Sequence, residues 1–261
     1  MYNKYLKCAI TLITNGFIPL IDLTSTSNIF NNLDSPFLNK NAWELYFNQP
    51  FNLTLDKVDQ NSIKRVKCEH FYSVNFDEIY GNDILRDYWS LMSKKYFPIN
   101  KSIIKEAEAI KYELFKSSDN ILGILMRGTD FLSKKPKYHN IPPTNEIVFQ
   151  DIKKMNEKNK YDYFFITTED YYIMKAFIRK YGNKLKHITF KNINYNYTSK
   201  NPIALSNDIK GNIDYMKNYL INIIILSKCL DIICARTNGA IGAFILSSGF
   251  RYKKVYNLGK Y

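Results

Sequence analysis

Asn120-Ile121-Leu122-Gly123-Ile124-Leu125-Met126-Arg127-Gly128-Thr129-Asp130 is the stretch that decides the fold of this 261-residue chain. Its apolar run is short and nearly continuous, which is typical of a strand buried on both faces of a parallel sheet. Ligands of such sheets bind beyond the carboxyl ends of the strands, where Arg127 and Asp130 stand. A guanidinium there can hold a phosphate through two parallel hydrogen bonds, and Gly128 lets the backbone come close. A structural Arg–Asp pair in an ordinary turn accounts for the stretch equally well.

Strands and helices alternate from this stretch to the end of the chain. The pattern predicts further strands at 163–166, 185–190, 230–235 and 254–258, and helices at 145–159, 171–181, 212–228 and 240–247. Alternation of this kind predicts a doubly wound α/β domain, with a parallel sheet and right-handed crossovers.

The chain before this region has a different pattern. A helix is predicted at 5–15, stopped by Asn15-Gly16, and a buried strand at 17–22 that ends in Asp22. This order resembles the middle of a βαβ unit whose first strand and glycine-rich turn would precede Met1. Further along, the sequence predicts a strand at 63–72 and helices at 83–96 and 100–115, while the aromatic stretch 41–50 packs in the core or lines a sugar site. The polar turn 117–120 marks the expected domain boundary.

Charge and cysteine usage limit the classes of partner and compartment. The formal net charge is +13, which favours an anionic partner such as a nucleotide, a nucleic acid or an acidic membrane surface. No Lys/Arg-rich block stands out, so a nucleic-acid partner is not expected. Cys8, Cys68, Cys229 and Cys234 match no zinc spacing, and a reducing, cytoplasmic compartment suits them. The longest apolar stretch, 219–233, is interrupted by polar residues, so we expect at most peripheral contact with the inner face of a membrane.

Polar residues follow three of the predicted strands, and a parallel sheet brings such ends to one edge. The first set is Arg127 and Asp130, and the other two are Thr168-Glu169-Asp170 and Arg236-Thr237-Asn238. The last set opens a helix, whose exposed amides and positive dipole would bind a diphosphate. Structural interpretations are also available: Thr168, Thr237 and Asp170 are of residue types that commonly form helix N-caps. His139, which lies outside the three sets in a lysine-rich loop, is most simply interpreted as a solvent-exposed residue.

These motifs together resemble those of the α-1,6- and protein O-fucosyltransferase superfamily, including its rhizobial nodulation type. Met126-Arg127-Gly128-Thr129-Asp130 is similar to the family's arginine motif, roughly His-x-Arg-Arg-(Gly/Thr)-Asp after a strand. Thr167-Thr168-Glu169-Asp170 and Arg236-Thr237-Asn238-Gly239-Ala240 are similar to its second and third motifs. The segment 137–143 is similar to a stretch of bacterial relatives. Two departures are evident: Leu125 stands in the place of the family's histidine, and Gly128 replaces its second arginine.

The resemblance implies two Rossmann-like domains facing each other across a cleft, with the N-terminal one incomplete. Residues 1–118 would form the acceptor side and residues 119–261 the nucleotide-sugar side. By resemblance Arg127 holds the β-phosphate, and Gly128 and Thr129 are counted with the donor site. Asp130 is the candidate base, or else it only orients Arg127. The second motif implies a guanosine contact by Glu169 or Asp170, and the third implies phosphate contacts by Arg236, Thr237 and Asn238. Thr168 and Gly239 are counted with the donor site, and Lys137 and His139 with the acceptor or its loop.

The implied activity is transfer of a deoxysugar, fucose, from a GDP donor to a glycan hydroxyl in surface polysaccharide or lipo-oligosaccharide synthesis. Such enzymes invert the anomeric centre and need no metal or cofactor beyond the nucleotide sugar. The expected partners are therefore the nucleotide sugar and a glycan acceptor. A non-catalytic nucleotide- or glycan-binding remnant of such an enzyme is the alternative. A nucleic-acid-binding protein, suggested by the charge of +13, is disfavoured because that charge is not clustered.

Overall fold

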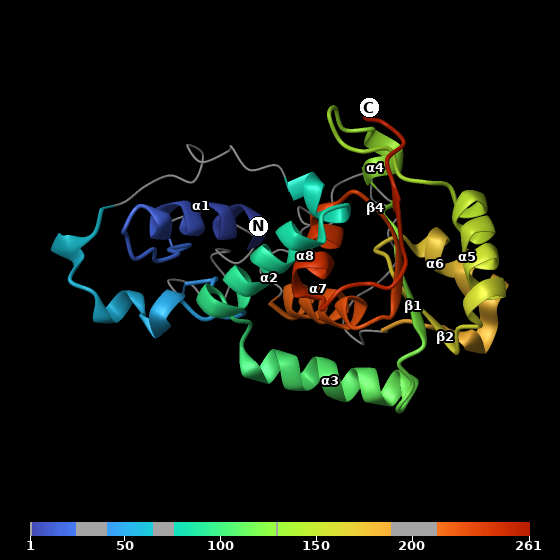
Figure 1. The fold of residues 1–261 in the computed structure, drawn as a ribbon, viewed down its shortest axis with the longest axis horizontal. Helices are drawn as coiled ribbons and strands as arrows, with labels where there is room; N and C mark the ends of the chain where they lie inside the picture. Colours follow the sequence, from blue (N-terminus) through green and yellow to red (C-terminus); the bar gives the residue numbers. More distant parts are fainter. Residues whose placement is uncertain (1, 25–40, 65–75, 129, 189–212) are drawn as a thin grey trace.

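A five-stranded parallel sheet organises the C-terminal half of the protein, seen here in a computed structural model that describes residues 2–24, 41–64, 76–128, 130–188 and 213–261 (Figure 1). The strands, in chain order, are β1 (Ile121–Leu125), β2 (Tyr163–Thr167), β3 (Leu185–Lys186), β4 (Asp231–Ala235) and β5 (Lys253–Tyr256). Their spatial order is β3-β2-β1-β4-β5. The predicted parallel α/β fold is thereby confirmed for this half.

The order of the strands reverses direction at β1, which pairs with β2 on one side and with β4 on the other. From β1 the chain passes through α5 (Asn145–Asn159) to β2 and through α6 (Tyr171–Tyr181) to β3. It then returns to the far side of β1 through α7 (Ile213–Ser227), and α8 (Asn238–Leu246) links β4 to β5. The carboxyl ends of β1 and β4 therefore form a topological switch point, where ligands of such sheets bind.

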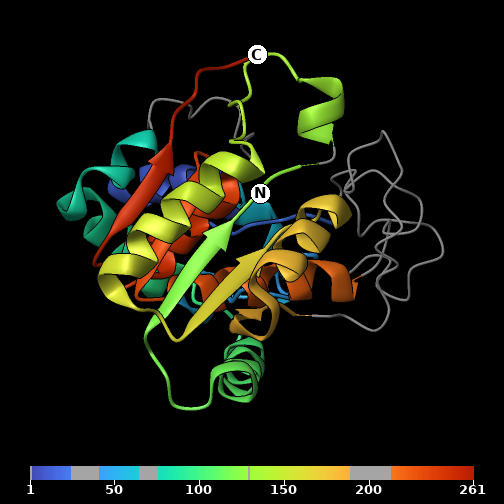
Figure 2. The ribbon, with the colours of Figure 1, turned by 90° about the vertical axis from the view of Figure 1, so that its right-hand side faces the viewer.

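Two helical layers cover the two faces of the sheet (Figure 2). On one face Val148 and Ile152 of α5 and Phe177 of α6 pack against alternate strand residues. On the other face α7 and α8 form a second, larger core with the remaining strand residues. Gly123 allows α7 to lie against β1, because a Cβ there would be 2.7 Å from Leu226 Cδ1. Sequence and packing agree here: strands buried on both faces need apolar residues at nearly every position.

In the described parts of the N-terminal half, the regular elements are helices joined by irregular segments. It comprises α1 (Tyr2–Thr14), α2 (Asp83–Tyr96) and α3 (Lys101–Phe115), with single 3-10 turns at Pro50–Asn52, Leu55–Lys57, Gln60–Ser62 and Phe76–Tyr80 (η5). Its core side chains, such as Leu6, Trp43 and Trp89, belong to the same apolar cluster as α7 and α8. Trp43 is 1% exposed, which supports the core interpretation of the aromatic stretch 41–50. No β-strand lies in the described residues of 1–118, and the division into two Rossmann-like domains stays a prediction.

The strand predicted at 17–22 is wrong, because these residues form no ladder. Side-chain amides take the place of a neighbouring strand. Gln49 accepts a hydrogen bond from the Ile21 amide at 2.9 Å and donates one to the Ile21 carbonyl at 2.7 Å. Asn41 likewise binds the Leu23 amide at 3.1 Å. The backbone groups of Ile21 and Leu23 therefore have partners without a sheet, which the local sequence pattern does not reveal.

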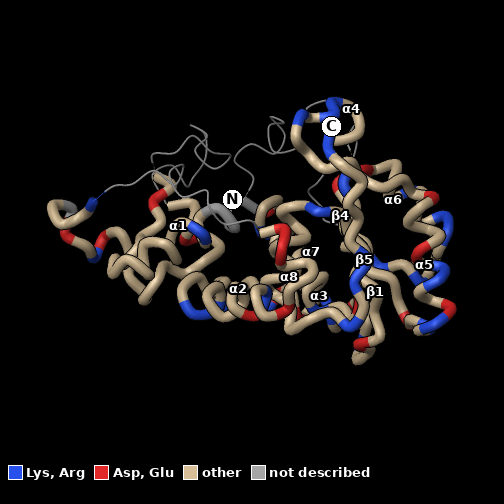
Figure 3. Tube along the Cα trace, turned by 45° about the horizontal axis from the view of Figure 1, so that its top comes forward, with Lys and Arg blue, Asp and Glu red and all other residues tan. Residues whose placement is uncertain are grey.

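Other predicted elements differ in extent or lie outside the described residues. Most of the strand predicted at 63–72 and the end of that predicted at 185–190 fall outside them. The loop predicted after β1 begins with a short helix, α4 (Asp130–Lys134). Lys and Arg lie in both halves of the described chain with Asp and Glu between them (Figure 3). None of the helices that the structure describes is long and apolar enough to cross a membrane.

Candidate functional site

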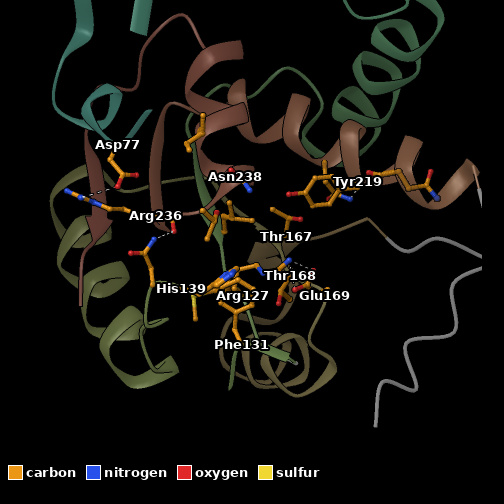
Figure 4. Close-up of a pocket in the computed structure, with 18 of the residues that line it drawn as sticks. Asp77, Arg127, Phe131, His139, Thr167, Thr168, Glu169, Tyr219, Arg236 and Asn238 are labelled. Atoms are coloured by element: carbon orange, nitrogen blue, oxygen red, sulfur yellow. Dashed lines mark hydrogen bonds and ion pairs between the residues drawn. The ribbon is translucent and has the colours of Figure 1, made fainter. Parts of the chain in front are cut away.

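A pocket of about 470 Å³ lies at the switch point, against the carboxyl ends of β1, β2 and β4 (Figure 4). All three polar sets predicted from the sequence contribute to it. The site residues from the prediction that line it are Arg127, His139, Thr168, Glu169, Arg236, Thr237, Asn238 and Gly239. The sheet thus brings together residues that are more than a hundred positions apart in the sequence.

Arg127, directly after Met126 at the end of β1, is held on two sides. Its Nη1 lies 2.6 Å and 2.7 Å from the two carboxylate oxygens of Glu169. Its guanidinium carbon lies 4.4 Å from the ring centroid of Phe131, a cation–π distance. The side chain is 26% exposed and lines the pocket. A guanidinium carries five N–H donors, so an arginine held through Nη1 can still bind a phosphate.

Asp170 has a structural role, because it is the N-cap of α6. Its Oδ1 accepts hydrogen bonds from the amides of Tyr172 at 2.9 Å and Ile173 at 3.0 Å, which caps α6. The residue is buried and does not line the pocket. Gly128 packs directly on it, because a Cβ at position 128 would be 2.3 Å from Asp170 Oδ2. Gly128 also lies outside the pocket lining.

The first turn of α8 forms the opposite wall. Thr237 caps the helix by accepting a hydrogen bond from the Ala240 amide at 3.1 Å, and Asn238 stands exposed at the rim. Gly239 lets Tyr219 of α7 approach, since a Cβ there would be 2.5 Å from the Tyr219 hydroxyl. The backbone amides and dipole at the N-terminal end of a helix favour an anion.

Arg236 precedes that turn and is tied to the N-terminal half of the chain. Its Nη1 lies 3.8 Å from Asp77 of η5, and its guanidinium faces the Tyr80 ring at 5.9 Å. The Tyr80 hydroxyl donates to the Thr237 carbonyl at 3.2 Å. Burial and nearby negative groups raise the pKa of Tyr80 well above its usual range, so this donor stays protonated. The N-terminal half thereby helps to fix the first turn of α8.

The end of the chain shapes the remaining wall. Residues 259–261 pair with the loop after α4: the Tyr138 amide donates to the Tyr261 carbonyl and the Tyr261 amide to the His139 carbonyl. Asn140 donates to the Arg236 carbonyl at 2.8 Å. His139 consequently lines the pocket, whereas Lys137 is exposed outside it with its ammonium over the Tyr138 ring.

Two predicted site residues cannot be placed by their side chains. Thr129 lies outside the described residues, and Asp130 is described only as the first residue of α4. The base role of Asp130 therefore stays a prediction. The described residues hold no group of three or more His, Cys, Asp or Glu arranged to bind a metal ion.

Sequence reasoning missed several residues of the pocket. Asp77, Phe131 and Asn140 lie on a 3-10 turn, a short helix and a loop, where periodicity carries no signal. The other missed group is a set on α7 that lines the pocket: Tyr215, Asn218, Tyr219 and Asn222. Their spacing of three and four residues places them on one face of an otherwise apolar helix, a readable signal that the prediction did not use.

The fold is similar to that of solved fucosyltransferase structures. The structure is similar to an α-1,6-fucosyltransferase NodZ soaked with GDP-fucose, with a TM-score of 0.53 at 12% identity over 94% of this chain and 87% of that one. It is also similar to the fucosyltransferase NodZ from Bradyrhizobium, with a TM-score of 0.51 at 14% identity over 93% and 86% of the two chains. No protein-family model matches the sequence, and no curated protein matches it significantly. The resemblance predicted from the motifs is thereby confirmed at the level of the fold.

Proposed function

We propose that this protein is an inverting, metal-independent glycosyltransferase that moves fucose from GDP-fucose to a glycan hydroxyl. One observation carries the proposal: Arg127, Arg236 and the first turn of α8 converge on one pocket at the switch point of the sheet. Two guanidinium groups and a helix N-terminus suit a ligand with two or three negative charges. The similarity to NodZ structures soaked or co-crystallised with GDP-fucose or GDP supports the choice of donor.

The proposed reaction is a single displacement at the anomeric carbon. The acceptor oxygen bonds to that carbon as the carbon–oxygen bond to the β-phosphate breaks, and the electron pair leaves with GDP. Negative charge grows on the β-phosphate in the transition state, where Arg127 and the α8 amides would stabilise it. Asp130 would take the proton of the acceptor hydroxyl. Because these cationic and dipolar groups neutralise the leaving group, EDTA should leave the rate of transfer unchanged.

The decisive variant is Arg127→Ala, with GDP release from GDP-fucose measured in the presence and absence of a glycan acceptor. Loss of one such charge-stabilising group costs about 3 kcal/mol, so turnover should fall about a hundredfold or more while the circular dichroism spectrum is unchanged. Arg179→Ala is the matched control, since Arg179 is exposed in the last turn of α6. Near-normal turnover by a folded Arg127→Ala variant would refute the assignment.

A non-catalytic remnant that binds nucleotide or glycan is the second candidate. It makes a different prediction from an enzyme: GDP would stabilise the protein in a thermal-shift assay, and no GDP would be released from GDP-fucose with any acceptor. A ligand at about 100 times its dissociation constant stabilises the folded state by about 2.7 kcal/mol, which such an assay resolves readily. A screen of GDP-, UDP-, dTDP- and CMP-sugars tests the donor base at the same time.

The cellular role that we propose is synthesis of surface polysaccharide or lipo-oligosaccharide at the cytoplasmic face of the inner membrane. The net charge of +13 suits peripheral attraction to anionic lipid. Sedimentation with vesicles containing anionic lipid at low salt, and release at high salt, is the expected behaviour. Equal sedimentation with neutral vesicles would contradict the electrostatic explanation.

A further inference from the structure

Helix α7 presents a polar face to the pocket although most of its length is apolar. Tyr215, Asn218, Tyr219 and Asn222 line the pocket together. The next residues around the helix, such as Ile221 and Ile223, are buried in the core. A polar face on a core helix is costly unless its groups find partners, so a ligand is a natural partner for this face. We call Asn218, Tyr219 and Asn222 the α7 face.

The polar groups of the α7 face are not used by the rest of the described protein. Asn222 donates its amide hydrogen to the Asn218 carbonyl at 3.0 Å, which leaves its side-chain oxygen as an acceptor. Among the described residues, the Asn222 oxygen, the Asn218 amide group and the Tyr219 hydroxyl have no hydrogen-bond partner. All three residues are half-buried. By contrast, Arg127 and Arg236 have acidic partners within the pocket wall.

The position of Tyr219 relates the α7 face to the anion-binding groups. Its hydroxyl lies against Gly239 in the first turn of α8. Burial raises the pKa of Tyr219 to about 12, Arg127 lowers it in part and Glu169 adds to the rise, so the phenol stays neutral and close to both charges. In Figure 4 Tyr219 and Glu169 lie on one side of the pocket, and Asp77 and Arg236 on the other. The α7 face is therefore next to the groups proposed to bind the diphosphate, on the side of Glu169.

We propose that the α7 face binds the nucleoside of the donor, through hydrogen bonds to its base edge and ribose hydroxyls. This inference rests on the proposed function, because it assumes that a diphosphate occupies the site of Arg127 and α8. The α7 face offers uncharged donors and acceptors, which suit the uncharged end of a nucleoside diphosphate rather than its phosphates. The sugar then occupies the opposite side, near Asp77, Arg236 and His139, where the N-terminal half meets the pocket.

Two variants test the inference: Tyr219→Phe, which removes one hydroxyl, and Asn222→Ala, which removes one amide. Tyr181→Phe is the matched control, since the Tyr181 hydroxyl is buried on α6, on the other face of the sheet. Dissociation constants for GDP, GDP-fucose and pyrophosphate are measured by calorimetry on the full chain, with circular dichroism to verify folding. One lost hydrogen bond should weaken GDP binding about 2- to 12-fold in each variant. Pyrophosphate binding should be unchanged, and so should all three ligands in the control.

Each outcome separates the inference from the proposed function. If the folded variants bind GDP as the wild type does, or bind only GDP-fucose more weakly, then the α7 face does not contact the nucleoside. An equal loss for pyrophosphate would place the contact at the phosphates and also overturn the inference. If the wild type binds GDP, the variants bind it more weakly and no transfer occurs, then the inference about the α7 face is correct and the proposed transferase activity is wrong. A wild type that fails to bind GDP would refute both.

Discussion

Gly128→Ala is the substitution for which the structure gives the sharpest expectation. The added Cβ would lie 2.3 Å from Oδ2, 2.6 Å from Cγ and 2.5 Å from Cβ of Asp170. These distances are far inside van der Waals contact, and Asp170 is buried and fixed by its two cap hydrogen bonds. Crowding of this kind costs about 1–3 kcal/mol, and displacing the cap forfeits about 1 kcal/mol. We therefore expect the free energy of unfolding to fall by about 2 kcal/mol.

A double-mutant cycle with Asp170→Gly isolates the cause. Glycine is itself an acceptable N-cap, so Asp170→Gly alone should cost only a few tenths of a kcal/mol relative to a polar cap. It also removes all three atoms that obstruct position 128. In that background Gly128→Ala should cost less than about 0.5 kcal/mol, which gives a coupling energy of about 1.5 kcal/mol.

The assay is urea unfolding followed by the fluorescence of Trp43 and Trp89, both buried. Equal costs of Gly128→Ala in the two backgrounds would refute the reasoning, because the penalty would then not come from Asp170. GDP binding is measured alongside. Since Arg127 and Glu169 flank the two positions, Gly128→Ala should also weaken GDP binding. Removing the clash with Asp170 in the double variant should restore the affinity for GDP.

Three further outcomes are expected. Asp231→Ala should lower the free energy of unfolding by about 2 kcal/mol in urea titration, because the buried Tyr161 hydroxyl and the Tyr252 amide both lose their acceptor; a cost below about 0.5 kcal/mol would contradict this. Gly239→Ala should lower the free energy of unfolding, because its Cβ would lie 2.5 Å from the Tyr219 hydroxyl, and adding Tyr219→Phe should recover part of that stability; no recovery would exclude the contact as the cause. Burial lowers the pKa of His187 below 6.5, so the unfolded chain binds the proton more tightly and stability should fall as the pH drops below 6.5; His187→Gln should flatten this dependence, and an unchanged pH profile would count against it.

Local patterns were sufficient for most strands and helices of the C-terminal half. The helices predicted at 145–159 and 171–181 have those bounds in the structure, and Thr144 and Asp170 cap them. The apolar runs before Arg127 and Arg236 became β1 and β4 because strands buried on both faces must be apolar throughout. The chemistry of their carboxyl ends followed from topology, since parallel strands bring those ends to one edge.

Local patterns failed where partners come from distant segments. The extended residues 17–22 have apolar side chains typical of a strand, yet their backbone pairs with the side chains of Asn41 and Gln49. Asp77 reaches the pocket only because η5 packs against α8 and brings its carboxylate to Arg236. No period in the sequence encodes either contact.

By itself, the sequence determined the alternation of strands and helices after residue 119 and the polar ends that carry Arg127, Glu169 and Arg236, because hydrophobic periodicity and capping are local. The sequence offered Asp170 as a cap of α6, but only the tertiary structure decided that its neighbour Glu169 holds Arg127 and that one face of α7 lines the pocket. The local sequence does not encode either contact. The partner of Glu169 and the pocket beside α7 come from elements that are distant in the sequence, and only tertiary packing brings them together.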